Sequence, residues 1–369
     1  MPDPRSGEVA PAGVLAAHFP GRPQEARYFD TASVGLVPAA VREAVGRCYS
    51  ALEHGRLGTA QLNRRIAQAY ELLAAEFGVT VPETAVASST SDAVAAITRL
   101  IPWRSGDEII VLEQDFPSIV MPWYHAGPGA RVRKVAPLAG DERLTPLLAA
   151  IGRNTRVVAV SHVNSTTGTR LDLVALGRAC REAGVLLVVD GAQAGGCLPA
   201  EAEHVDFYVC TGYKWLLAGF GVAAVVGRKE TLRHLGIRAG HSFSAALAYG
   251  YFNVPGVCAL GAALEVRQQI GTEWITARAG ELAARIHRGC VSLGLPPVAP
   301  IERTGTLVCL DTAFDPEAAT ARLAAQGVHV AARGSRLRIS GHFYNSDEDV
   351  EVLLASLAGL ARQHPRHRP

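Results

Sequence analysis

Two side chains in the middle of the sequence have the types and neighbours that imine chemistry needs. Asp190 ends an apolar run and is followed by small residues, and Lys214 directly follows the next apolar run, between a tyrosine and a tryptophan. Apolar surroundings desolvate a lysine, which lowers the pKa of its amine and leaves more of it as a neutral nucleophile. Taken alone, Asp190 is more typical of a helix cap, whereas a lysine with these neighbours is less typical of a surface position.

A third segment supplies hydroxyl groups at the start of a helix pattern. Residues 88–91 read Ser-Ser-Thr-Ser, and they lead into an apolar helical run. Free backbone N–H groups, hydroxyl donors and the positive end of a helix dipole together form a seat for phosphate. By itself this segment fits an ordinary helix cap equally well. The order of phosphate seat, aspartate and lysine matches what pyridoxal 5'-phosphate (PLP) requires, namely an anchor, a partner for the pyridine nitrogen and an imine-forming amine.

The elements around these segments alternate between strand and helix patterns. Helix patterns cover 66–77 and 171–183, and short runs rich in Val and Ile predict strands at 108–112, 157–163, 185–189, 207–210 and 222–226. Continuous apolar strands between helices favour an α/β fold with a mainly parallel sheet covered on both faces. Such sheets bind ligands at the carboxyl ends of their strands, where Asp190 and Lys214 fall.

The pattern changes after about residue 250. A long helix is predicted to begin with 260–269, strands are predicted at 306–310, 328–331 and 336–340, and a last helix at 347–360 with Ser346 as its N-cap. These elements indicate a smaller α+β domain. We therefore divide the chain into an N-terminal arm (1–27), a large cofactor-binding domain (28–250) and a small C-terminal domain (251–369).

Composition narrows the class of protein. The 369 residues include 36 basic and 34 acidic side chains, a balance that disfavours a nucleic-acid partner. The seven cysteines are scattered without CxxC spacing, which is typical of reduced thiols in a cytoplasmic protein rather than of disulfides or zinc. Neither a signal peptide nor an apolar stretch long enough to cross a bilayer is apparent, so we expect no membrane association.

Together these segments resemble the class V aminotransferase family of fold-type I PLP enzymes, which includes cysteine desulfurases, selenocysteine lyases, isopenicillin N epimerase-like proteins, kynureninase and C–S lyases. The similarity extends from Tyr-Phe-Asp-Thr-Ala-Ser at 28–33 to His-Phe-Tyr-Asn at 342–345. Its most specific parts are Asp-Gly-Ala-Gln at 190–193 and Tyr-Lys at 213–214. The resemblance implies a fold-type I enzyme whose small-molecule substrate is an α-amino acid, and a homodimer, because active sites of this fold type lie across a dimer interface.

The same resemblance implies roles for individual residues. Lys214 would hold PLP as a Schiff base and later move the proton of the substrate Cα, and Asp190 would pair with the pyridinium nitrogen. Arg338 would bind the substrate carboxylate, for which a planar guanidinium is suited. The other implied cofactor contacts are Thr90, Ser91 and Thr211 at the phosphate, Gln193 at the phenolic oxygen, Phe116 stacked on the ring and Asn164 near the ring.

Two departures from the family pattern bear on the reaction. Cysteine desulfurases carry a nucleophilic cysteine on a loop before the substrate arginine, and here residues 331–337 read Ala-Ala-Arg-Gly-Ser-Arg-Leu without one. This argues against sulfur transfer through a persulfide. Relatives often place a Gly-Thr pair that reaches the phosphate of the partner subunit near 250, and Tyr251 stands in place of that threonine.

We therefore expect a PLP-dependent lyase that catalyses β-elimination from a cysteine S-conjugate or a related amino acid, in specialised metabolism. An aminotransferase or an epimerase of the same family is the alternative; epimerisation would need a second acid or base, for which His241, His342 and Tyr251 are candidates. A non-catalytic binding or scaffold protein of this fold is the remote alternative. It is disfavoured because Lys214, Asp190 and Arg338 are all present.

Overall fold

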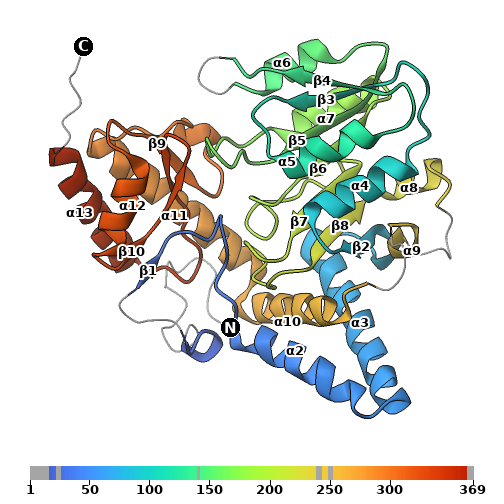
Figure 1. The fold of residues 1–369 in the computed structure, drawn as a ribbon, viewed down its shortest axis with the longest axis horizontal. Coiled ribbons are helices and arrows are strands. Elements are labelled where there is room, and N and C mark those ends of the chain that lie inside the picture. The colour runs from blue at the N-terminus through green and yellow to red at the C-terminus, as the bar shows by residue number, and fades with distance from the viewer. Residues whose placement is uncertain (1–15, 22–25, 139–141, 238–242, 248–251, 364–369) are drawn as a thin grey trace.

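The computed structural model describes residues 16–21, 26–138, 142–237, 243–247 and 252–363. Its larger body is built on a seven-stranded sheet in the order β2-β8-β7-β6-β5-β3-β4 (Figure 1). The strands are β2 (Thr84–Ala87), β3 (Glu108–Leu112), β4 (Arg131–Val135), β5 (Thr155–Ser161), β6 (Leu186–Asp190), β7 (Phe207–Thr211) and β8 (Ala223–Gly227). Strands β3 to β7 pair in parallel, and β8 is antiparallel to both β7 and β2. The predicted α/β fold with a mainly parallel sheet is confirmed.

Both faces of this sheet are buried, because successive side chains of its strands enter different cores. Ile109 and Val111 pack with residues of α4 (Thr90–Leu100) and α5 (Pro117–Val120). Ile110 and Leu112 pack on the other face, in a core shared with α3 (Arg56–Phe77), α7 (Leu173–Glu182) and α10 (Val254–Ile270). This arrangement explains why the strands read as continuous apolar runs in the sequence.

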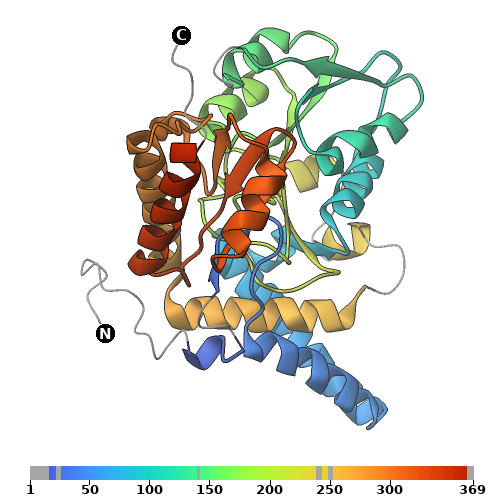
Figure 2. The same cartoon turned by 60° about the vertical axis from the view of Figure 1, so that its left-hand side comes forward.

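Helix α10 belongs to the core of the larger body. It packs on α2 (Ala39–Leu52) and α3, and Figure 2 shows it running alongside α2. Residues around its whole circumference are buried, including Val257, Leu260 and Leu264. The domain boundary that we placed at residue 250/251 therefore falls just before a helix that shares the core of the larger body.

The smaller body consists of the antiparallel sheet β11-β12-β9 with α11 (Thr272–Ser292), α12 (Pro316–Ala324) and α13 (Asp347–Gln363) (Figure 1). Its strands are β9 (Val308–Asp311), β11 (Ala331–Arg333) and β12 (Arg336–Ile339). The backbone N–H of Asp349 donates to Ser346 Oγ at 3.1 Å, as expected for the cap of α13. The remaining helices are α6 (Leu144–Ala150), α8 (Lys229–His234), α9 (Phe243–Leu247), η1 (Val81–Glu83), η2 (Met121–His125) and η4 (Ile301–Arg303).

The beginning of the described chain joins the smaller body. Strand β1 (Arg27–Tyr28) pairs in parallel with β10 (Val328–His329), and an isolated bridge links Asp30 to Ser340. The buried ring of Phe29 lies in the same core as residues of α11, β9 and α13. Sequence reasoning missed this pairing, since a two-residue strand has no recognisable periodicity. It brings residues 30–35 across to the larger body and over the loop that carries Lys214.

Candidate active site

The carboxyl ends of three neighbouring strands carry polar side chains. Ser161, Asp190 and Thr211 are the last residues of β5, β6 and β7, and parallel strands place them at the same edge of the sheet. Together with Lys214 they line a cavity of about 110 Å³. We call it the strand-end cavity, and its other lining residues are Ser89, Thr90, Ser91, Phe116, Ser118, Val163, Ser165, Ala192, Gln193 and Tyr213.

Asp190 lies at the bottom of the strand-end cavity with both carboxylate oxygens oriented. Ser118 Oγ donates to Oδ2 at 2.8 Å, and the backbone N–H of Ala192 donates to Oδ1 at 2.8 Å. Burial raises the pKa of Asp190, while these two hydrogen bonds and the charge of Lys214 act in the opposite direction. A protonated ring nitrogen in the cavity would favour the carboxylate form further. Ser118 was not among the predicted residues.

Lys214 is 7% exposed, and its amine lies above two aromatic rings. Its Nζ atom is 5.6 Å from the centroid of the Phe116 ring and 5.6 Å from that of the Tyr213 ring. Burial lowers the pKa of Lys214 to about 8, because desolvation outweighs the attraction of Asp190. The charges of Arg338 and Arg333 lower it further. A large fraction of this amine is therefore neutral, and nucleophilic, near pH 8.

The backbone around Lys214 is in close contact with Gly35. The backbone N–H of Gly35 donates to the carbonyl oxygen of Tyr213 at 2.8 Å. A Cβ atom at Gly35 would lie 2.1 Å from the carbonyl oxygen of Lys214, so only glycine fits there. Leu217, three residues after the lysine, has a φ of 58°, which is uncommon for a residue with a side chain. The loop formed by residues 30–35 thus holds the backbone of Tyr213 and Lys214 in place.

The start of α4 has the features of an anion seat, with one hydroxyl that lacks a partner. Ser89 caps the helix by accepting from the N–H of Asp92 at 3.1 Å, and the Asp92 carboxylate accepts from the backbone and hydroxyl of Ser88. Thr90 Oγ1 is buried without a hydrogen-bond partner. A buried hydroxyl left unpaired costs free energy, and a phosphate oxygen in the cavity would satisfy it. Ser91 lines the same cavity from the exposed side of the helix.

Gln193 is fixed in orientation by two neighbours. Its Nε2 atom donates to the carbonyl oxygen of Ala32 at 3.0 Å, and its Oε1 atom accepts from the indole Nε1 of Trp215 at 3.0 Å. The second hydrogen of Nε2 remains for a ligand, because a side-chain amide has two donors. Thr211 lines the cavity and forms a side-chain hydrogen bond with Tyr213.

Asn164 does not line the strand-end cavity. Its Oδ1 accepts from the backbone N–H groups of Thr166 and Thr167 at 2.9 and 3.0 Å, and its Nδ2 donates to the carbonyl oxygen of Gln114 at 3.1 Å. These bonds define the turn after β5. The neighbouring residue Ser165 lines the cavity, and the position of Asn164 near the cofactor ring stays a prediction.

Arg338 approaches from β12 and is 2% exposed. Its Nη1 donates to the carbonyl oxygen of Ser165 at 3.3 Å, and its Nη2 donates to Ser33 Oγ at 2.7 Å and faces Asp30 Oδ1 at 3.4 Å. Its Nε is buried without a partner. Three of its five N–H donors are used in this way, so the guanidinium is oriented and keeps two donors, one of them on Nε, for a carboxylate.

One of the candidates for a second acid or base, His342, belongs to the described residues and does not line the strand-end cavity. His342 is buried, and its Nε2 donates to the carbonyl oxygen of Trp215 at 3.1 Å. Burial lowers the pKa of His342 to about 3, so it stays neutral and packs behind the lysine segment. This corrects its assignment as a candidate acid or base. His241 and Tyr251 lie outside the residues that the structure describes.

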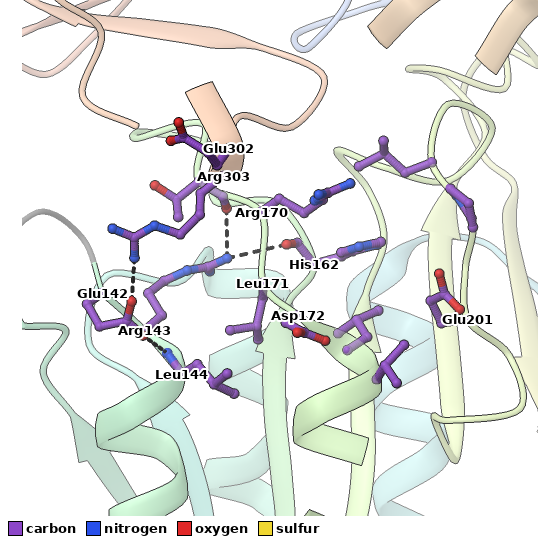
Figure 3. Close-up of a pocket in the computed structure, with 15 residues that line it drawn as sticks. Glu142, Arg143, Leu144, His162, Arg170, Leu171, Asp172, Glu201, Glu302 and Arg303 are labelled. Carbon is purple, nitrogen blue, oxygen red and sulfur yellow. Dashed lines mark hydrogen bonds and ion pairs between the residues drawn. The ribbon is translucent and has the colours of Figure 1, made fainter. Parts of the chain in front are cut away.

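A second and larger cavity, of about 510 Å³, lies where η4 of the smaller body meets the loops after β5 and before α6 (Figure 3). We call it the charged cavity; it is lined by Glu142, Arg143, His162, Arg170, Asp172, Glu201, Glu302 and Arg303, among others. Arg143 Nη2 donates to the carbonyl oxygens of His162 and Thr169 at 3.3 and 2.8 Å, and Arg303 pairs with Glu142. Arg143 also forms a buried ion pair with Asp115 at 3.5 Å.

The described part of the chain holds no group of three or more His, Cys, Asp or Glu side chains placed to bind a metal ion. Among the helices of the same residues, none is both long and apolar enough to cross a lipid bilayer.

The fold and the strand-end cavity define a fold-type I PLP enzyme, and comparison with known proteins names the family. Residues 27–353 match the family described as Aminotransferase class-V. The cysteine desulfurase CsdA of Escherichia coli is 30% identical over 281 residues, which cover 68% of this chain and 69% of the relative. Isopenicillin N epimerase of Streptomyces clavuligerus is 27% identical over 374 residues, covering 90% and 94%. The chain belongs to the class-V aminotransferase family, as the sequence predicted.

Solved structures agree on the fold. The crystal structure of Escherichia coli CsdA superimposes with a TM-score of 0.83 at 23% identity, covering 99% of this chain and 100% of the other. A cystine C–S lyase, C-DES, in complex with its product cysteine persulfide has a TM-score of 0.81 at 23% identity, covering 92% and 99%. Relatives with different reactions thus share one architecture, so the choice among reactions must come from the residues of this chain.

Proposed function

We propose that this protein binds PLP covalently through Lys214 and catalyses β-elimination from a cysteine S-conjugate or a related sulfur or selenium amino acid. The observation that carries the proposal is the convergence, on one cavity, of a desolvated lysine, a buried strand-end aspartate and a buried hydroxyl without a partner. Lys214, Asp190 and Thr90 match the imine, ring-nitrogen and phosphate positions of that cofactor. Arg338 supplies the contact for an amino-acid carboxylate.

The proposed roles of the residues follow from their positions. When bound, PLP withdraws electrons from the substrate Cα and so makes its proton acidic. Asp190 keeps a proton on the ring nitrogen, with Ser118 and the Ala192 N–H orienting its carboxylate. Lys214, whose pKa is about 8, accepts the proton from the substrate Cα near neutral pH. Phe116 is half exposed beside the lysine, where it can cover the ring and limit the access of water.

The thiols of the chain support elimination rather than desulfurisation. All seven cysteines belong to the described residues, and all are buried. Burial raises the pKa of Cys197, which lies behind Trp215 against His342, to about 12. The hairpin of β11 and β12 carries Gly334 and Ser335 at its turn instead of a cysteine. No thiolate is thus available to accept sulfur, and the leaving group must depart as its own stable thiolate.

The proposal is tested with the purified protein loaded with PLP. Cysteine S-conjugates should yield pyruvate and ammonia in equal amounts, whereas alanine, which lacks a leaving group, should yield neither. Pyruvate is measured with lactate dehydrogenase, and the cofactor is recovered and identified by chromatography. Accumulation of pyridoxamine phosphate without pyruvate would instead identify an aminotransferase, and inversion of the substrate at Cα would identify an epimerase.

We also propose that the enzyme is a homodimer of the cytoplasm. The free buried cysteines support a reducing compartment. The resemblance to enzymes whose active sites lie across a dimer interface supports a homodimer. Tyr251 is the residue expected near the phosphate bound by the partner subunit. Light scattering of the eluting protein measures the assembly, and a monomer with full activity would contradict it.

A further inference from the structure

Three arginines lie on one face of the β11–β12 hairpin. Arg333 is paired with Arg336, and Ala331 with Arg338, and residues directly opposite in an antiparallel pair share a face. The alternate residues Leu337 and Ile339 point the other way, into the core of the smaller body. The register of this hairpin therefore aims every one of its arginines toward the side from which Arg338 reaches Ser165 and Ser33.

The three guanidinium groups differ in their partners. Arg336 is paired with Asp311 at 2.8 Å, and Arg338 faces Asp30 at 3.4 Å. Arg333 donates to the carbonyl oxygen of Ala332 at 3.0 Å and to Ser33 Oγ, both of them neutral. It has no ion pair with any carboxylate among the residues that the structure describes. Within the described part of the chain, one positive charge on this face thus has no carboxylate partner.

This charge lies next to the candidate active site. Ser33 Oγ accepts from both Arg333 and Arg338, so the two guanidinium groups reach the same oxygen atom. The charge of Arg333 also lowers the pKa of both Lys214 and Arg338. Arg338 is buried close to the amine, whereas Arg333 is exposed. A substrate whose α-carboxylate binds Arg338 therefore has Arg333 toward its outer, solvent-facing end.

We propose that Arg333 binds a second anionic group, so that this enzyme prefers amino acids whose side chain ends in a carboxylate or a similar acid. The inference rests on the proposed function, because it takes Arg338 as the contact for the α-carboxylate. A monoanionic substrate leaves Arg333 uncompensated, and a dianionic one neutralises both arginines by charge-assisted hydrogen bonds. A conjugate such as S-carboxymethylcysteine belongs to this class, and its S-carbamoylmethyl analogue, of the same shape but neutral at the side-chain end, does not.

The test measures binding in the absence of turnover. Glutarate and its monoamide glutaramate have nearly the same shape and differ by one charge, and neither carries an amine that can react with the cofactor. Calorimetric titration of the PLP-loaded wild type should show glutarate binding about tenfold or more tightly than glutaramate, the difference that one added charge-assisted contact gives. Arg333→Gln should remove this preference by weakening glutarate alone. Arg333→Lys, which keeps the charge, should retain part of it.

Arg336→Gln is the matched control, since it removes an arginine from the same face whose charge is already paired. It should keep the preference for glutarate. Equal binding of the two ligands by the wild type would overturn the proposal, and so would an equal loss of both in Arg333→Gln, which would place Arg333 at the α-carboxylate. If the wild type prefers glutarate to glutaramate but cysteine S-conjugates yield no pyruvate, the proposed reaction is wrong and the proposed anion site at Arg333 is supported.

Discussion

The two cavities differ in size and in the state of their polar groups. The charged cavity, of about 510 Å³, is several times larger than the strand-end cavity, of about 110 Å³. Its Arg143 is bound to backbone carbonyls and Asp115, its Arg303 to Glu142, and its Asp172 to the N–H of Ala175 at the start of α7. In the strand-end cavity, Thr90 Oγ1 lacks a partner and Lys214 has a lowered pKa. Arg338, which reaches the carbonyl oxygen of the lining residue Ser165, has a buried Nε without a partner.

This contrast separates polar groups that hold the protein together from polar groups that are kept for a ligand. Arg143 ties three carbonyl oxygens of the β5 loop to the buried carboxylate of Asp115, so it fixes the loop that presents Ser165. A side chain whose donors are used within the protein stabilises the fold, and few of its donors are available to a substrate. Cavity size therefore does not locate the chemistry, because what distinguishes the smaller cavity is a buried hydroxyl without a partner close to a desolvated amine.

The largest effect is expected at the amine of the strand-end cavity. Lys214→Ala should abolish covalent attachment of PLP and lower turnover of S-conjugates by about a thousandfold or more, because the lysine serves as both anchor and base. Attachment is measured by borohydride reduction and mass spectrometry of the labelled peptide. Lys229→Ala, at the start of α8, is the control and should change neither quantity. A label that persists in Lys214→Ala would refute the assignment.

The next largest effect is expected in the charged cavity, and on stability. Arg143→Met removes one partner of an ion pair in which both side chains are buried, leaving Asp115 with an uncompensated charge. Such a loss costs about 3–5 kcal/mol of the free energy of unfolding. Urea denaturation of the apoprotein measures it. A variant as stable as the wild type would show that Asp115, whose pKa burial raises to about 6, takes up a proton at little cost.

A smaller effect is expected at the guanidinium above the strand-end cavity. Arg338→Lys keeps the charge but cannot make the planar, two-pronged contact with a carboxylate. The loss of a hydrogen bond to a charged group, about 1.5–3 kcal/mol, should raise KM about tenfold or more. The absorbance of the bound cofactor should stay as in the wild type. An unchanged KM would remove Arg338 from the substrate site.

A hydroxyl of α4 gives a finer comparison between ligand-binding and structural groups. Thr90→Val should leave the stability of the apoprotein nearly unchanged, because its hydroxyl has no partner there, yet weaken PLP binding about tenfold. Thr98→Val in the same helix should do the reverse, since its hydroxyl donates to the carbonyl oxygen of Ala95 at 2.7 Å. Equilibrium dialysis and thermal unfolding measure the two quantities. Equal cofactor affinities in the two variants would argue against a phosphate at Thr90.

The smallest effect is expected at the rim of the charged cavity. Arg303→Gln breaks the pair with Glu142, in which both side chains are about a third exposed. Pairs of this kind contribute about 1 kcal/mol or less. Urea denaturation should therefore hardly distinguish the variant from the wild type, and PLP attachment should be unaffected. A loss as large as that of Arg143→Met would mean that the two ion pairs of this cavity act as one network.

Much of the fold could be predicted because its strands are buried on both faces. Strand β3 was predicted with its observed bounds, and β5 to β8 within about two residues. Strand β4 was missed, because it lies at the sheet edge and three of its five residues are charged. The helix expected from 66 begins at Arg56, since its first turns are exposed and carry little apolar periodicity. The long helix after 254 ends at Ile270 before Gly271, whose φ is 106°.

The candidate site was predictable where the local sequence carries the signal. Asp190 ends a strand, Thr90 begins a helix and Lys214 follows the end of a strand by three residues, and they meet because parallel strands share an edge. Ser33 and Ser118 have no such pattern, because only the tertiary fold brings them to Arg338 and Asp190. Side-chain direction was equally beyond the sequence, since the hydrogen bonds of Asn164 to the backbone of Thr166 and Thr167 appear only in the structure.

The meeting of residues 30–35 with the end of β12 makes the site a late product of folding. Ala32 N–H donates to Ser340 Oγ across 308 positions, and the hydroxyls of Thr31 and Tyr344 share a hydrogen bond across 313. Contacts between such distant parts of a chain form slowly, because a very long loop must close. Ser33, Asp30 and the Gly35 contact over Lys214 all depend on that closure. We therefore expect the protein to become competent for its substrate only after nearly the whole chain has been synthesised.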